Sequence, residues 1–438
     1  MLVIASGICL SVLDATLISV ALPSISRDLN IEAAASVWLI NAYQITIVVS
    51  ILPLATLGDK VGYRRVYRIG MALFVLASVA CALSDSVGQL AAARAAQGLG
   101  AAGIMSVNAA LVRLIYPRSR LGRGIALNAF VVAAASAAGP SIAAAILAVG
   151  DWKWLFIINI PLGVATLAGA MKFLPASGKS DKEFDMLSAV LNVATFGLVF
   201  MGVDLLGHLD FRLSTFAILA AGVAIGVVFV RRQLRLPLPL LPVDLLRIPV
   251  FALSMGTSVC SFAAQMIAFV SLPFFLQYTL GYSAVETGLL MTPWPLALMV
   301  TAPFSARLLD RYPAGLLGGV GLGIFAVGLL ALALLSSAPS PADVSWRMAL
   351  CGIGFGLFQA PNNHTILTTA PPNRSGGASG MLGTARLTGQ TVGATIVALT
   401  FALAPGRSWI AMVIGAALAG GGAVLSSLRV SAGSRQPN

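Results

Sequence analysis

A carboxylate lies in the middle of the first apolar stretch of the chain. Asp14 is the only charged side chain between Met1 and Pro23. Placing a charge at bilayer depth costs at least ~2.5 kcal/mol, so such residues usually carry function. Desolvation favours the protonated form of a carboxyl group. We therefore expect Asp14 to hold a proton and to release it when it becomes hydrated or paired. The alternative is a structural hydrogen bond to a neighbouring helix.

Two arginines also lie inside apolar stretches. Arg94 falls near one end of the stretch 89–112, and Arg386 falls deeper within 377–403. Arg386 is about nine residues from the end of its stretch, or roughly 13 Å at helical rise. It could bind substrate, pair with Asp14, or make an interhelical hydrogen bond to a backbone carbonyl.

Trp294 lies between two prolines, Pro293 and Pro295, where a continuous helix must be distorted. An indole on a broken helix beside a cavity could stack on an aromatic cation, whereas the alternative is a packed or lipid-facing tryptophan. Four further polar side chains at span depth are candidates for the same substrate cavity: Tyr43, Gln44, Asn128 and Gln265.

The composition indicates an integral membrane protein. The chain is 58% hydrophobic and only 10% charged, whereas soluble domains carry roughly 25% charged residues. A net charge of +12 would suggest nucleic-acid binding in a soluble protein. Here the basic residues lie in short loops between apolar stretches, so we expect a bilayer and no nucleic acid as the partner. The four cysteines lie in apolar stretches without CxxC spacing, which predicts buried thiols and no metal site.

A membrane-spanning helix needs about 20 apolar residues. Fourteen stretches meet this length to within a few residues: 1–23, 36–57, 66–84, 89–112, 124–148, 154–173, 185–206, 213–230, 249–276, 285–306, 314–336, 346–368, 377–403 and 409–428. A cytoplasmic N-terminus places most loop cations inside, which satisfies the positive-inside rule. The sequence thus predicts an all-α, multi-pass protein with fourteen spans and both termini in the cytoplasm.

An internal repeat divides the chain. The segments 55–62 and 306–313 end the second and tenth stretches, and each contains an aspartate followed by a basic residue, at Asp59 and Asp310. Such similarity is typical of transporters built from two parallel halves. We expect a six-helix half over 1–173, two inserted helices with their connectors over 174–247, and a second six-helix half over 248–438.

Four motifs resemble the 14-spanning drug:proton antiporter family of the major facilitator superfamily. They occupy 13–23 in the first stretch, 57–65 in the following loop, 94–100 in the fourth stretch and 136–140 in the fifth. The similarity covers nearly the whole chain and implies the major facilitator fold, two six-helix halves with two inserted helices. Three residues depart from the family pattern, because alanine replaces glycine at Ala55, Ala143 and Ala144. The second half also lacks a clear mid-span carboxylate.

The family resemblance also implies roles for residues whose function the hydropathy pattern alone does not indicate. It implies that Arg94 influences proton transfer near Asp14, whereas the alternative is an interfacial cation whose side chain extends to the surface. It also implies gating roles for the loop between the second and third stretches, for its counterpart in the second half and for a bendable site in the fifth stretch. These residues are Asp59, Gly62, Arg64, Arg65, Asp310, Gly139 and Pro140.

Two polar features have plainer interpretations. The pattern Ser283-Ala284-Val285-Glu286 is a capping box at the start of a helix. Asp204 and His208 lie near the end of a predicted inserted span, where we expect them at the membrane interface. We find no P-loop and no HExxH motif, so neither ATP-driven transport nor hydrolysis is indicated.

The sequence therefore predicts a transporter and not an enzyme. We expect a multidrug-type antiporter of the cell membrane that exports amphipathic, monovalent cations, uses the proton gradient as its energy source and needs no cofactor. Its partners would be the substrate, protons and lipid, and nothing requires more than a monomer. The alternatives are an exporter of a neutral or anionic metabolite and a membrane sensor that kept the fold without transport.

Overall fold

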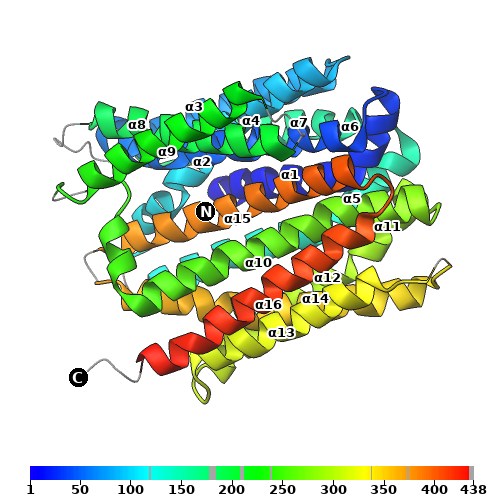
Figure 1. The fold of residues 1–438 in the computed structure, drawn as a ribbon. Coiled ribbons are helices and arrows are strands. Elements are labelled where there is room, and N and C mark those ends of the chain that lie inside the picture. The colour runs from blue at the N-terminus through cyan, green and yellow to red at the C-terminus, as the bar shows by residue number, and fades with distance from the viewer. Residues whose placement is uncertain are drawn as a thin grey trace. The chain divides into compact units, whose positions relative to one another are not determined.

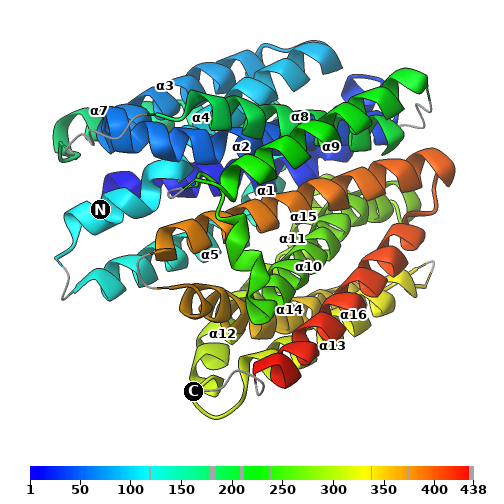
Figure 2. The ribbon, with the colours of Figure 1, turned by 60° about the vertical axis from the view of Figure 1, so that its left-hand side comes forward.

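The computed structural model describes residues 1–117, 120–176, 184–207, 212–236, 239–336, 338–371 and 374–433. These residues are almost entirely helical and contain no strand (Figures 1 and 2). The chain separates into two compact units. The first comprises Met1–Gly202 and Phe211–Phe229, and the second comprises Val203–Asp210 and Val230–Asn438.

The first unit is formed by the helices that follow one another from the N-terminus. They are α1 (Leu2–Asp28), α2 (Ala33–Val61), α3 (Tyr63–Ala82), α4 (Val87–Ile115), α5 (Leu121–Val149), α6 (Trp154–Ile157), α7 (Asn159–Phe173) and most of α8 (Met186–Gly207) and α9 (Leu213–Gln233). Gly62, the residue between α2 and α3, has a φ of 100°, a conformation that residues with a Cβ rarely adopt. A single glycine therefore makes the connection between these two long helices.

The second unit contains the remaining helices. They are η2 (Val243–Arg247), α10 (Pro249–Phe274), η3 (Phe275–Thr279), α11 (Ala284–Met291), α12 (Pro293–Leu308), α13 (Ala314–Ala333), α14 (Pro341–Thr369), α15 (Ser375–Leu403) and α16 (Ser408–Gly433). The break between α11 and α12 falls at Thr292, next to Pro293. This confirms the distortion that the two prolines predict. The capping box is also confirmed, because Ser283 and Glu286 make both reciprocal hydrogen bonds at the start of α11.

The same pairings of helices occur within each unit. In the first unit, α4 packs against α2 and α3, α1 packs against α5 and α7, and α3 packs against α7. In the second unit, α14 packs against α12 and α13, α10 packs against α15 and α16, and α13 packs against α16. The boundaries 1–173, 174–247 and 248–438 stay predictions.

Twelve helices of the described residues are long and apolar enough to cross a membrane. The long helices α14 and α15 are not among these twelve, so the total of fourteen spans stays a prediction. The packing of α9 fits a position next to lipid. Only 17% of its apolar 18-residue window is buried inside the protein. A helix with so much exposed apolar surface is stable next to lipid and not next to water.

The expectation that Asp204 lies at the membrane interface stays a prediction. Asp204 lies three residues before the end of α8, near the end of the predicted span. Its side chain is only 2% exposed, so protein surrounds it at that position. His208 lies outside the described residues.

Candidate functional site

The Asp14 carboxylate is enclosed by side chains from other helices of the first unit. Asp14 is 2% exposed. Its Oδ2 atom forms an ion pair with Nη1 of Arg94 on α4. Its Oδ1 atom accepts hydrogen bonds from Nε2 of Gln97 at 2.9 Å and from Nδ2 of Asn159 at 2.8 Å. One cation and two amides therefore stabilise the negative charge.

Arg94 is fully buried, so the alternative of an interfacial cation is wrong. Its Nη1 also donates to Oε1 of Gln97 at 2.6 Å, and its Nε donates to the carbonyl of Leu39 at 3.3 Å. The guanidinium carbon lies 4.2 Å from the ring centroid of Tyr43 and 5.8 Å from that of Phe156. These distances are within the range of cation–π attraction. Nη2 has no hydrogen-bond partner.

Helices α2 and α3 complete the surroundings of this ion pair. Tyr43 donates its hydroxyl proton to the carbonyl of Ser11 at 3.1 Å, which ties α2 to α1. Gln97 Nε2 also donates to Oγ of Ser78 on α3 at 3.0 Å, and the Cys81 thiol lies 3.7 Å from Gln97 Oε1. We call Asp14, Arg94, Gln97, Asn159 and Tyr43 the Asp14 cluster.

Two members of the Asp14 cluster were not singled out as site residues from the sequence. Gln97 lies one helical turn after Arg94, a spacing that places both side chains on the same face of α4. Asn159 follows the interruption between α6 and α7 at Ile158, and a polar amide deep in an apolar stretch is the signal that could have found it. Their burial, 0% exposed for Gln97 and 1% for Asn159, excludes solvent from the carboxylate.

A close contact between α1 and α5 lies two residues after Asp14. A Cβ at Gly139 would overlap the Oγ1 and Cβ atoms of Thr16. Pro140 is buried next to it, and α5 continues as a helix through this proline. The small residue at 139 therefore allows α5 to approach α1 where Asp14 projects. On the same helix, Asn128 accepts a hydrogen bond of 3.0 Å from Asn108.

The predicted gating loop is shorter than expected. Asp59 belongs to the last turn of α2, and only Gly62 separates α2 from α3. Asp59 is exposed and accepts a hydrogen bond of 2.6 Å from the Tyr63 hydroxyl. Arg64 donates from Nη2 to the carbonyl of Met171 at the end of α7. The gating roles stay predictions.

The corresponding turn of the second unit follows α12. Asp310 is exposed there, and its N–H donates to the carbonyl of Arg307 at 3.3 Å. The exposed Arg65 belongs to the first turn of α3.

Trp294 is packed inside an aromatic group of the second unit. Its ring centroid lies 5.0 Å from that of Phe269 and 5.1 Å from that of Phe325. The indole is 1% exposed, and its N–H has no hydrogen-bond partner. This conformation matches the alternative of a packed tryptophan, so stacking on a substrate would require these rings to move.

The other predicted substrate residues are distributed over both units. Arg386 lies on α15 with its guanidinium carbon 5.6 Å from the ring centroid of Phe262, and its Nε has no hydrogen-bond partner. Gln265 is half-buried on α10, and Gln44 is buried on α2. Among these predicted substrate residues, Tyr43 contacts Arg94 of the ion pair.

No group of three or more His, Cys, Asp or Glu residues that could hold a metal ion occurs in the described parts of the chain. The four cysteines are free thiols, buried at Cys81 and Cys351 and half-buried at Cys9 and Cys260.

The comparisons with known proteins agree with this architecture. The profile of the Major Facilitator Superfamily matches residues 4–394. The chain is 54% identical over 433 residues to "Uncharacterized transporter YebQ" of Escherichia coli strain K12, covering 98% of this chain and 95% of the relative. It is 28% identical to "Riboflavin transporter RibZ" of Clostridioides difficile, with 88% and 84% covered. It is 30% identical to "Multidrug resistance protein Stp" of Mycobacterium tuberculosis, with 89% and 73% covered.

A solved structure of a POT family transporter in complex with a thioalcohol-conjugated peptide has the same fold. Its TM-score is 0.74 at 15% identity, with 99% of this chain and 95% of that chain covered.

Proposed function

Because the chain belongs to the Major Facilitator Superfamily and is a multi-pass membrane transporter, we propose that it exports amphipathic monovalent cations in exchange for protons. The exchange uses alternating access, in which the substrate site opens to one side of the membrane at a time. The proton gradient supplies the energy, and both termini face the cytoplasm of the cell whose membrane holds the protein.

The Asp14–Arg94 ion pair carries this proposal. Both side chains are buried, and the carboxylate is the group that a proton can neutralise. Removing one partner of a buried ion pair costs about 3–5 kcal/mol, because the other charge stays buried and uncompensated. Protonation of Asp14 therefore destabilises the conformation in which Arg94 is enclosed by the Asp14 cluster. A conformation that gives Arg94 other partners becomes favoured, and proton binding shifts the equilibrium toward it.

The cation substrate enters the cycle through the same carboxylate. In the described conformation Asp14 is 2% exposed and both of its oxygens accept hydrogen bonds, so a substrate reaches it only after the cluster opens. Proton, substrate and Arg94 then compete for one negative charge. A single carboxylate suits a monovalent cation and a low ratio of protons to substrate. The name of the relative Stp, a multidrug resistance protein, supports drug export.

A second candidate is transport of a neutral or anionic metabolite. Two buried or half-buried arginines, Arg94 and Arg386, outnumber Asp14 among the site residues that lie inside the predicted spans. A relative named as a riboflavin transporter supports this alternative. In that case Arg386, whose Nε has no hydrogen-bond partner, would contact the substrate and Asp14 would only couple the proton.

One assay separates the two candidates. Inverted membrane vesicles containing the protein are energised by a pH gradient, and uptake of a fluorescent lipophilic monocation is measured for the wild type, Asp14→Asn and a control variant, Asp85→Asn. Asp85 is 80% exposed in an ion pair with Lys153, so its replacement leaves the Asp14 cluster intact. We expect uptake by the wild type and by Asp85→Asn, and none by Asp14→Asn.

Equal uptake by Asp14→Asn and wild type would disprove the coupling role of Asp14. If no cation is transported by any variant but riboflavin or an organic anion is, the metabolite candidate replaces the cation exporter.

A further inference from the structure

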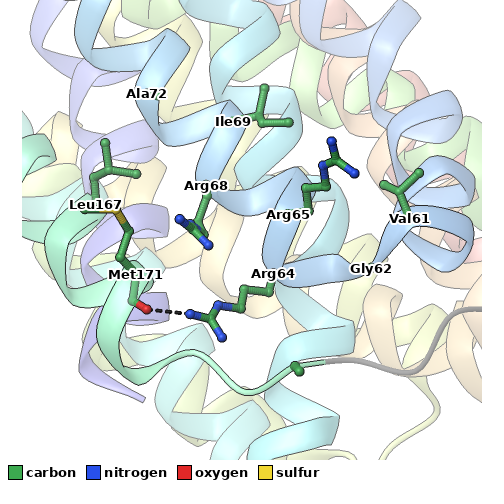
Figure 3. Close-up of a pocket in the computed structure, with 10 residues that line it drawn as sticks. Val61, Gly62, Arg64, Arg65, Arg68, Ile69, Ala72, Leu167 and Met171 are labelled. Atoms are coloured by element: carbon green, nitrogen blue, oxygen red, sulfur yellow. Dashed lines mark hydrogen bonds between the residues drawn. The ribbon is translucent and has the colours of Figure 1, made fainter.

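A pocket outside the Asp14 cluster opens between the first turns of α3 and the last turns of α7 (Figure 3). Its volume is about 810 Å³. Three arginines of α3 line it, Arg64, Arg65 and Arg68, together with apolar side chains from both helices. None of the described residues that line it is acidic. Among the described lining residues, the positive charge of the three arginines is therefore not offset by a carboxylate.

The arginines are arranged to hold an anion. Arg64 and Arg68 lie one helical turn apart, and both extend toward the end of α7, whereas Arg65 extends toward Val61 (Figure 3). Arg64 is fixed by the hydrogen bond from its Nη2 to the Met171 carbonyl, and its buried Nε has no hydrogen-bond partner. The positive end of the α3 dipole adds to the field, because α3 begins at Tyr63.

Apolar, exposed side chains form the other part of the pocket lining. Ile69 on α3 is 59% exposed and Met171 on α7 is 48% exposed, and Leu167 lies one helical turn before Met171 on α7. Exposed apolar side chains continue from here along both helices, at Leu76 on α3 and Val164 on α7. α3 and the segment Trp154–Phe173, which contains α7, are long and apolar enough to cross a membrane, so we expect this face to contact lipid.

An amphipathic anion fits these two parts. The three arginines repel a cationic substrate, and a small free anion would leave the apolar part of the pocket unfilled. Positive loops mark the cytoplasmic side of a membrane protein, and basic pockets between spanning helices on that side bind acidic lipid head groups. We propose that this pocket binds an acidic phospholipid. Its phosphate contacts Arg64 and Arg68, and one acyl chain lies along Ile69, Leu167 and Met171.

The bound lipid would connect two helices of the first unit. It bridges α3 and α7 next to Gly62, the single residue that joins α2 to α3. The lipid therefore adds its contacts to the one hydrogen bond by which Arg64 already joins α3 to α7. We expect acidic lipid to raise the thermal stability of the purified protein more than a zwitterionic lipid does.

The test measures lipid retention on the full-length protein by native mass spectrometry. The detergent-solubilised protein is incubated with equal amounts of dioleoyl phosphatidylglycerol and dioleoyl phosphatidylcholine. We expect selective retention of phosphatidylglycerol by the wild type and about a fivefold loss of it in Arg68→Gln. The control Arg231→Gln removes an exposed arginine of α9 that does not line the pocket, and it should retain phosphatidylglycerol as the wild type does.

A second variant, Ile69→Asn, tests the apolar part of the pocket. Ile69 is exposed, so its replacement leaves the protein folded, and it should also reduce phosphatidylglycerol retention. A third arm adds an excess of glycerophosphoglycerol, the head group without acyl chains, and we expect it not to displace the lipid.

Three results would overturn the proposal. The first is equal retention of the two lipids by the wild type. The second is equal loss of phosphatidylglycerol in Arg68→Gln and Arg231→Gln, which would indicate diffuse attraction to surface charge. The third is displacement of the lipid by glycerophosphoglycerol, which would indicate a site for a free anion. None of these results depends on the transported substrate.

Discussion

The side-chain amide of Asn159 donates a hydrogen bond of 2.8 Å to Oδ1 of Asp14 and so joins the start of α7 to the middle of α1. Gln97 donates to the same oxygen from α4. Side chains of α4 and α7 thus stabilise the negative charge that Asp14 carries on α1. Each donor stabilises the ionised carboxylate, so the charge of Asp14 depends on amides from two other helices.

Replacing Asn159 with leucine should destabilise the folded protein. The variant removes one hydrogen bond to a charged group, an interaction of about 1.5–3 kcal/mol. Because Oδ1 of Asp14 then keeps only the hydrogen bond from Gln97, the unfolding temperature should fall and proton-driven uptake should weaken. Differential scanning fluorimetry and monocation uptake in inverted vesicles measure the two effects. Asn159→Gln keeps an amide and should partly restore both. Unchanged stability and uptake in the leucine variant would contradict the role of Asn159.

Replacing Arg94 with methionine should leave the Asp14 charge uncompensated. We expect a loss of about 3–5 kcal/mol of stability, because one partner of a buried ion pair is removed. Thermal unfolding of the purified protein measures this loss. In the double variant Asp14→Asn, Arg94→Met no charge remains to be compensated, so it should unfold at a higher temperature than Arg94→Met. The two side chains are not coupled if the stability that the double variant loses relative to the wild type equals the sum of the losses of the two single variants.

Adding a methyl group at residue 139 should disturb the contact between α1 and α5. In Gly139→Ala the new Cβ overlaps the side chain of Thr16, so we expect lower thermal stability and weaker transport. The double variant Gly139→Ala, Thr16→Gly removes the overlap and should recover part of both. Gly383→Ala on α15 is the matched control, because a Cβ there meets no atom within 4 Å. Equal behaviour of Gly139→Ala and Gly383→Ala would show that the contact tolerates the methyl group.

Gly62→Ala should destabilise the connection between α2 and α3. Gly62 has a φ of 100°, and a residue with a Cβ held in such a sparsely populated region costs of order 1–3 kcal/mol. Gly88→Ala provides the comparison, because Gly88 lies in the first turn of α4 with open space around it. Differential scanning fluorimetry should show a lower unfolding temperature for Gly62→Ala only. A lower temperature for Gly88→Ala of the same size would rule out backbone strain as the cause.

Local features were predicted well because they depend on neighbouring residues in the chain. The apolar stretches predicted the long helices, Pro293 predicted the break between α11 and α12, and Ser283 with Glu286 predicted the capping box. The length of the turn after α2 was predicted wrongly. Its apolar pattern ends before Asp59, but the helix continues to Val61 and the positive φ of Gly62 completes the turn.

The sequence by itself determined that the chain crosses a membrane many times and that Asp14 lies inside the first span. Only the tertiary structure decided which groups surround Asp14. Hydropathy reports the depth of a residue along a helix, but not the rotation of that helix about its axis. That rotation depends on packing between helices, such as the approach of Gly139 to Thr16. It turned Arg94 inward to Asp14, brought Gln97 and Asn159 to the same carboxylate, and enclosed Trp294 among phenylalanines.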